Sequence, residues 1–67
     1  MTVLRVYWQD YPGTNVFNIV KGLGFTPTAV EPVGIADCSM IEIKEDVTQD
    51  QLPDNIKIVD WKFSFDK

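Results

Sequence analysis

The chain contains no histidine, and this absence limits its chemistry more than any other feature of its composition. Histidine is the commonest general base near neutral pH, the base of Ser-His-Asp and Cys-His arrangements, and a usual zinc ligand. We therefore expect a protein that is not an enzyme and that binds neither a cofactor nor a metal ion.

Cysteine is almost as scarce, because Cys38 is the only one. A single cysteine forms no intramolecular disulfide, whereas small domains from oxidising compartments usually carry several. We expect Cys38 to act as a small buried hydrophobe, since no base adjoins it in the sequence. The cysteine content favours a reducing, cytoplasmic location.

Long apolar runs are also missing. Arg5, Asp10, Pro12 and Gly13 interrupt the first twenty residues where a signal peptide would be apolar. No run approaches the roughly 18 apolar residues of a membrane span. We expect no contact with a membrane.

Phosphate-binding and RNA-binding motifs are absent too. No Gly-rich loop precedes a predicted helix, because Gly22 and Gly24 end one. The aromatic signature of RNA-recognition motifs is missing, and a pI near 4.4 repels polyanions. We expect no direct binding of nucleic acid.

Basic residues are few, and the resulting charge is localised. Six Lys and Arg against ten Asp and Glu give a formal net charge of −4. Residues 42–54, called the acidic segment below, hold all of it, because the acids and bases elsewhere balance. Its charged residues are Glu42, Glu45, Asp46, Asp50 and Asp54, with Lys44 as the one base. Localised charge accelerates encounters with an oppositely charged partner.

A calcium site in this segment is not supported. Asp46, Thr48 and Asp50 match the first, third and fifth positions of an EF-hand loop. The sixth position is Gln51 where the motif needs Gly, and the twelfth is Lys57 where it needs a bidentate Glu. We therefore expect solvated carboxylates.

The residues that are present indicate one folded domain over residues 1–67. Eight aromatics and a 45% hydrophobic content are typical of a small globule. Alternating apolar residues predict strands over residues 2–9, 38–44 and 56–65. Residues 25–33 read as a sheet-edge strand, because Pro27 and Pro32 lack the N–H that a central strand needs.

A helix is predicted between the first two strands. Thr14 or Asn15 caps it, an apolar stripe recurs at helical spacing, and Gly24 ends it. The stripe consists of Val16, Ile19, Val20 and Leu23. A short helical turn capped by Thr48 is predicted within residues 47–52.

The predicted order β-α-β-β-(short α)-β matches a small α+β fold, a ferredoxin-like split βαβ unit with one antiparallel or mixed sheet. The first and third strands would lie in the centre, the last strand antiparallel to the first at an edge. One helix would cover the face of Leu4, Val6, Trp8, Ile41 and Ile43. An antiparallel meander in which residues 25–33 form a loop is the alternative.

The opposite face would then be uncovered, with Arg5 and Asp60 as a cross-strand pair. Its apolar residues would include Tyr7, Met40 and Ile58, which suit partner docking. The last strand, through Phe65, offers an edge for pairing with a second copy as a homodimer.

Two function classes follow. The first is a non-catalytic protein-binding module, an inhibitor or adaptor of the kind that phages and mobile elements encode. It would present the acidic segment to a basic protein surface, including that of a nucleic-acid-binding enzyme. The second is a small structural or regulatory subunit that oligomerises through its sheet face or edge strand.

Overall fold

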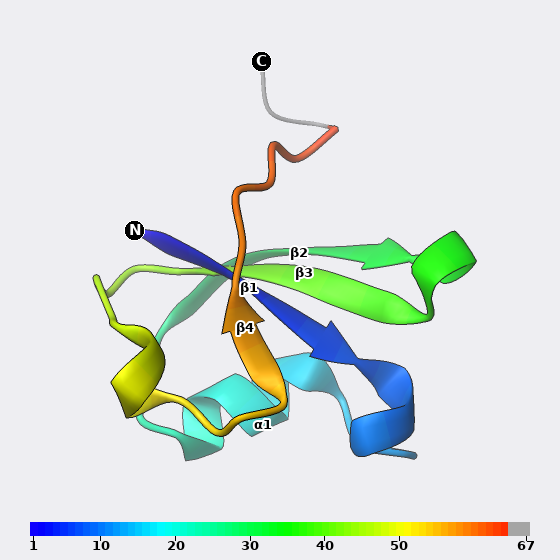
Figure 1. Cartoon of the computed structure of the whole chain (residues 1–67), viewed down its shortest axis with the longest axis horizontal. Helices are drawn as coiled ribbons and strands as arrows, with labels where there is room; N and C mark the ends of the chain where they lie inside the picture. Colours follow the sequence, from blue (N-terminus) through cyan, green and yellow to red (C-terminus); the bar gives the residue numbers. More distant parts are fainter. Residues whose placement is uncertain (65–67) are drawn as a thin grey trace.

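A four-stranded antiparallel sheet forms the centre of the computed structural model, which describes residues 1–64 (Figure 1). The spatial order is β2-β3-β1-β4, and every neighbouring pair is antiparallel. The strands are β1 (Thr2–Tyr7), β2 (Pro27–Val33), β3 (Cys38–Ile43) and β4 (Ile56–Ile58). The predicted α+β class and the central position of the first and third strands are confirmed.

The segment with two prolines forms an edge strand, as predicted. β2 pairs with β3 alone, with a register irregularity between Pro27 and Ala29. An edge strand tolerates proline because its outward N–H groups have no ladder partner. The meander alternative is therefore wrong, since it required a loop here.

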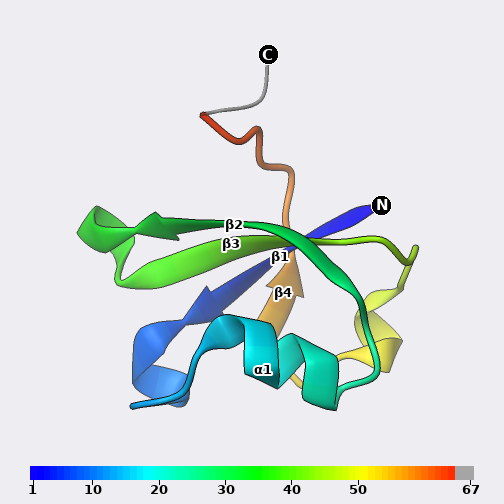
Figure 2. The same ribbon diagram turned by 180° about the vertical axis from the view of Figure 1, so that it is seen from behind.

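The helix α1 (Val16–Gly22) crosses one face of the sheet (Figure 2). Asn15 caps it by accepting a hydrogen bond from the Phe17 N–H at 2.8 Å. Val20 is fully buried, but Leu23 of the predicted stripe is 38% exposed. The helix thus ends before its last predicted apolar residue reaches the sheet.

The face of the sheet beneath α1, called the helix face, carries the larger core. Seven buried side chains form it: Leu4, Val6, Val20, Ile41, Ile43, Leu52 and Ile56. Each fully buried Val, Leu or Ile stabilises the fold by about 1.5–3 kcal/mol relative to an exposed one. The predicted placement of Leu4, Val6, Ile41 and Ile43 on this face is confirmed.

Trp8 does not belong to that core, contrary to the prediction. β1 ends at Tyr7, and Trp8 begins the 3-10 turn η1 (Trp8–Asp10). Its ring is 39% exposed, and its indole N–H donates to Ser39 Oγ at 2.8 Å. The change of backbone geometry after Tyr7 breaks the alternation on which the prediction depended.

The last strand is much shorter than predicted. β4 ends at Ile58, whereas the prediction ran to Phe65, which lies outside the described residues, as do Asp66 and Lys67. Residues 59–64, called the strap below, continue past β1 and β3 on the side away from α1 (Figure 1).

The strap covers part of the second face of the sheet, so the expectation of a fully uncovered face is wrong. Phe63, 3% exposed, packs with Cys38 and Met40. Glu31 of β2 accepts hydrogen bonds from the Ser64 N–H at 2.8 Å and the Ser64 hydroxyl at 3.1 Å. We call this side the strap face; its other apolar members are Val3, Tyr7, Ala29, Val33, Val59 and Trp61.

The connection between β3 and β4 contains the predicted helical turn in 3-10 form. It is η3 (Gln49–Gln51), and Thr48 stands at its N-cap. A full ferredoxin-like unit carries an α-helix at this point. Within residues 1–64, η3 alone occupies it.

Candidate functional site

The acidic segment begins with two glutamates that are engaged within the fold. Glu42 accepts a hydrogen bond from the Thr28 hydroxyl at 2.8 Å. Glu45 accepts two from Thr26, through its backbone N–H at 2.7 Å and its hydroxyl at 2.8 Å. The Thr26 N–H, followed by its hydroxyl, lowers the pKa of the Glu45 carboxyl. Both glutamates therefore tie β3 and its extension to the β2 side of the sheet.

The chain after Glu45 is fixed from the N-terminus of β1. The Thr2 hydroxyl donates to the Glu45 carbonyl at 2.9 Å and accepts from the Val47 N–H at 3.2 Å. Asp46 forms an ion pair with the amino group of Met1, and its side chain is 89% exposed. The backbone that carries Asp46 is thus held while the carboxylate stays in solvent.

Gln49 holds the second half of the acidic segment against the sheet edge. Its amide donates to the Ile56 carbonyl at 2.7 Å and accepts from the Ile58 N–H at 3.2 Å. A neighbouring strand would use these same outward backbone groups of β4. Leu52 anchors the end of η3, because its side chain is only 8% exposed.

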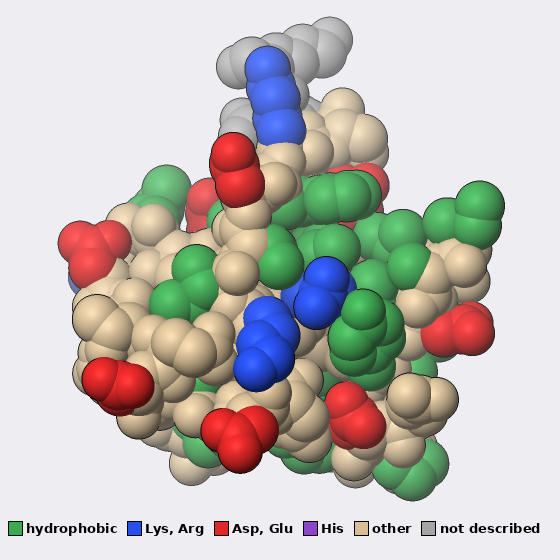
Figure 3. Space-filling view, viewed as in Figure 1, with side chains coloured by type: hydrophobic (Ala, Val, Ile, Leu, Met, Phe, Trp, Pro, Cys, Tyr) green, Lys and Arg blue, Asp and Glu red, His purple; other side chains and the backbone are tan. Residues whose placement is uncertain are grey.

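Asp50 and Asp54 are the free acids of the segment. Both are exposed, and within residues 1–64 neither forms an ion pair or a hydrogen bond through its carboxylate. Asp50 lies on η3, and Asp54 lies in the turn before β4. Figure 3 shows acidic side chains spread around the margin of the face seen in Figure 1.

The three apolar residues predicted for docking do not come together. Tyr7 and Met40 lie on the strap face, and Met40 is 7% exposed beneath the strap. Ile58 of β4 is the direct cross-strand partner of Leu4 of β1, so it lies on the helix face, contrary to the prediction. Its side chain is 39% exposed. The acids and the predicted apolar residues therefore form no single patch.

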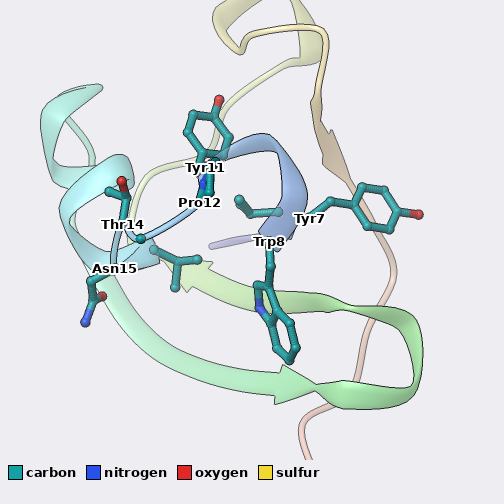
Figure 4. Close-up of a pocket in the computed structure, with 9 residues that line it drawn as sticks. Tyr7, Trp8, Tyr11, Pro12, Thr14 and Asn15 are labelled. Atoms are coloured by element: carbon teal, nitrogen blue, oxygen red, sulfur yellow. The ribbon is translucent and has the colours of Figure 1, made fainter.

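A pocket of about 460 Å³, which no sequence pattern predicted, lies at the end of β1. Thr14 and Asn15 lie on one side of it and Tyr7 on the other, with Trp8 between (Figure 4). Tyr11 adds a third aromatic ring, and its hydroxyl donates to Asn55 Oδ1 at 2.9 Å. The signal that could have revealed it is the Pro-Gly turn flanked by aromatic residues.

The pocket has aromatic walls and little chemistry. No charged side chain of the described residues lines it. The Trp8 indole N–H and the Asn15 side-chain oxygen are already bonded within the fold. It offers van der Waals contact and no acid-base pair.

Cys38 and the acids give no sign of a reactive centre. Cys38 is fully buried, and burial raises the pKa of its thiol. Within residues 1–64, no three His, Cys, Asp or Glu side chains lie close enough to hold a metal ion. In the same range, no helix is long and apolar enough to cross a membrane.

Comparison with protein-family models, curated proteins and solved structures finds no match for the chain.

Proposed function

We propose that the chain is a non-catalytic protein-binding module, an inhibitor or adaptor, that presents Asp46, Asp50 and Asp54 to a basic surface of a protein partner. The proposed setting is the reducing cytoplasm. We further propose that the fold is a shortened ferredoxin-like split βαβ unit in which the 3-10 turn η3 replaces the second helix.

One observation carries this proposal: hydrogen bonds hold the acidic segment to the sheet at two points. Thr2 fixes its first half, and Gln49 fixes its second half to β4. A loop ordered before binding loses less conformational entropy on binding than a flexible tail. The backbone that carries the exposed carboxylates is thus ordered in advance, which suits recognition by a matching basic surface.

The structure also separates acids that are bonded to the β2 side of the sheet from acids whose carboxylates are exposed. Glu42 and Glu45 are bonded to threonines of the β2 side, so their replacement would disturb the fold. Asp46, Asp50 and Asp54 are exposed and suit a binding test.

The test starts with proteins that co-purify with the tagged chain from its host, identified by mass spectrometry. Calorimetry then compares the wild type with the triple variant D46N, D50N, D54N. Exposed ion pairs contribute about 0.2–1 kcal/mol each, so affinity should fall roughly tenfold and its salt dependence should flatten.

A matched control neutralises three acids outside the segment: D10N, D37N and D60N change the net charge equally. We expect this control to bind nearly as tightly as the wild type. An equal loss in both variants would mean that net charge alone matters. Unchanged affinity and salt slope in the segment variant would refute the proposal.

The alternative is a subunit that forms oligomers through its sheet face or its last strand. The strap over one face and the Gln49 amide on β4 both weigh against it. Light scattering distinguishes the two, because the binding module should be a monomer and the subunit a stable oligomer.

A further inference from the structure

Two basic side chains stand side by side on the strap face. Arg5 of β1 and Lys57 of β4 are direct cross-strand partners, so both project to the same side of the sheet. Like charges at such positions repel each other, which destabilises the strand pair. Figure 3 shows basic groups together near the centre of this face, with the acids at its margin. We call Arg5 and Lys57 the basic pair.

Arg5 is partly buried, and an aromatic ring lies beside its guanidinium. Its guanidinium lies 4.9 Å from the centre of the Tyr7 ring, which supports the planar group from one side. Its Nε is buried and, within residues 1–64, has no hydrogen-bond partner. Nearly all buried polar atoms in folded proteins have a partner, so an orphaned guanidinium donor requires an explanation.

The two glutamates of this face accept hydrogen bonds from uncharged groups and form no ion pair among residues 1–64. Glu31 binds Ser64, and Glu42 binds Thr28. The predicted Arg5–Asp60 pair is wrong, because Lys57 lies opposite Arg5 and Asp60 follows the end of β4. Within the described chain, the one ion pair joins Met1 to Asp46. Among residues 1–64, neither member of the basic pair forms an ion pair.

The Trp61 indole adds to the excess of donors. Its Nε1 is also buried without a partner in the described chain, and Trp61 packs on the same face. The strap face therefore holds two buried donors without a partner among residues 1–64, beside two cations that form no ion pair there.

From these observations we propose that Arg5 and Lys57 bind the dianionic phosphate group of a small ligand. A guanidinium presents a planar fork that matches phosphate oxygens, and an ammonium adds a second charge. A phosphate carries about −1.5 to −2 charges at pH 7, which balances two cations better than a carboxylate does.

The same charges argue for a small ligand and against a nucleic acid. A duplex or a long single strand would extend beyond the basic pair, over acids at the margin of the face (Figure 3). A polyanion would be repelled there, whereas a compact phosphate would meet only the pair. This site is independent of the acidic segment and of the binding function proposed for it.

The test is an NMR titration of the 15N-labelled chain with inorganic phosphate and, separately, with phenyl phosphate. Sodium chloride at matched ionic strength is the salt control. We expect saturating shifts at the amides of Arg5, Tyr7 and Lys57 and at the Trp61 indole. Lys57→Gln should weaken binding about fivefold. Lys21→Gln, a matched change on α1, should leave it unaltered.

Other outcomes overturn the proposal. Diffuse ion screening would be the explanation if sodium chloride produced the same amide shifts or if the shifts did not saturate. The same holds if Lys21→Gln reduced the shifts as much as Lys57→Gln. Binding of an oligonucleotide without binding of either phosphate would replace the small ligand by a nucleic acid. Since Lys57 is exposed, its variant should fold, and its amide spectrum verifies this directly.

Discussion

Replacing Phe63 with alanine tests whether the strap is an integral layer of the fold. The ring is 3% exposed and packs with Cys38 and Met40. Truncating a buried Phe costs about 3–5 kcal/mol when the surroundings stay fixed. The strap can move away from the cavity, and the loss then approaches the burial term of about 1.5–3 kcal/mol. We therefore expect the free energy of unfolding to fall by about 2–4 kcal/mol.

That loss is large for a chain of this size. A 67-residue domain is stable by about 3–10 kcal/mol, so the variant should fold but with little reserve. Urea denaturation followed by far-UV circular dichroism measures the change. The matched control is Phe17→Ala, the same substitution at a side chain that is 39% exposed, which should cost clearly less.

A second assay reports on the strap itself. Cys38 is fully buried against Phe63, so a thiol reagent reaches it only when the strap opens. Each 1.4 kcal/mol lost from strap docking raises the open population about tenfold. Labelling of Cys38 in Phe63→Ala should therefore accelerate at least tenfold in native buffer. Equal labelling rates, or equal destabilisation by Phe17→Ala, would show that the strap contributes no more than a surface segment.

Three further changes probe other parts of the fold. Gln49→Ala leaves two backbone groups of β4 without a partner. It should lower the free energy of unfolding by about 1–2 kcal/mol, measured by urea denaturation, and should promote dimers that light scattering detects. Gln9→Ala, at an exposed site, should have neither effect. The hydrogen bonds from Thr26 lower the pKa of Glu45 in the folded state, so they stabilise the fold only while Glu45 is ionised. This stabilisation is fully present above the unfolded-state pKa of about 4.3 and is lost as the pH falls through the folded-state pKa. Glu45→Gln should thus lower the urea midpoint at pH 7 but not at pH 2, and an equal deficit at both would exclude this linkage. Asp37 has a φ of 53°, a left-handed conformation that a β-branched residue resists and glycine adopts freely. Asp37→Val should therefore lower the free energy of unfolding by about 1–2 kcal/mol, whereas Asp37→Gly should be tolerated. Equal melting temperatures of the two variants would contradict this.

The sheet was predictable from local sequence because alternating apolar residues in each central strand indicate which side chains share a face. Alternation in β1 placed Leu4 and Val6 opposite Arg5 and Tyr7, and the burial of the strand follows that alternation. Asn15 and Gly24 similarly marked the ends of α1, and Gly24 takes φ 92°. Local signals of this kind do not depend on distant parts of the chain.

The strap was not predictable because period-two alternation indicates extended chain and not ladder pairing. Val59, Trp61 and Phe63 alternate as a strand would, yet the strand ends at Ile58. The Val59 N–H still donates to the Val3 carbonyl at 3.0 Å, after which the chain passes onto the face of the sheet. The apolar residues of β3 on that face need a cover, and no local signal states which segment supplies it.

The acidic segment was predictable as a charge cluster but not as a set of different roles. Sequence shows five acids within thirteen residues. Whether a carboxylate binds a threonine, as Glu45 does, or stays free, as Asp50 does, depends on which strand lies beside it. The basic pair was missed for the same reason, since Arg5 and Lys57 are far apart in sequence and meet only through the β1–β4 register.

Both edges of the sheet have lost some of the backbone groups that an added strand would use. Pro27 and Pro32 remove N–H donors from β2, and the Gln49 amide occupies two outward groups of β4. A partner that adds a strand would find few free backbone groups on either edge. Binding by charged side chains needs no such groups, and the fold offers two surfaces of opposite sign for it. Because the acids of the negative surface are separate from the basic pair, the two proposed sites predict that neutralising one surface leaves binding at the other intact.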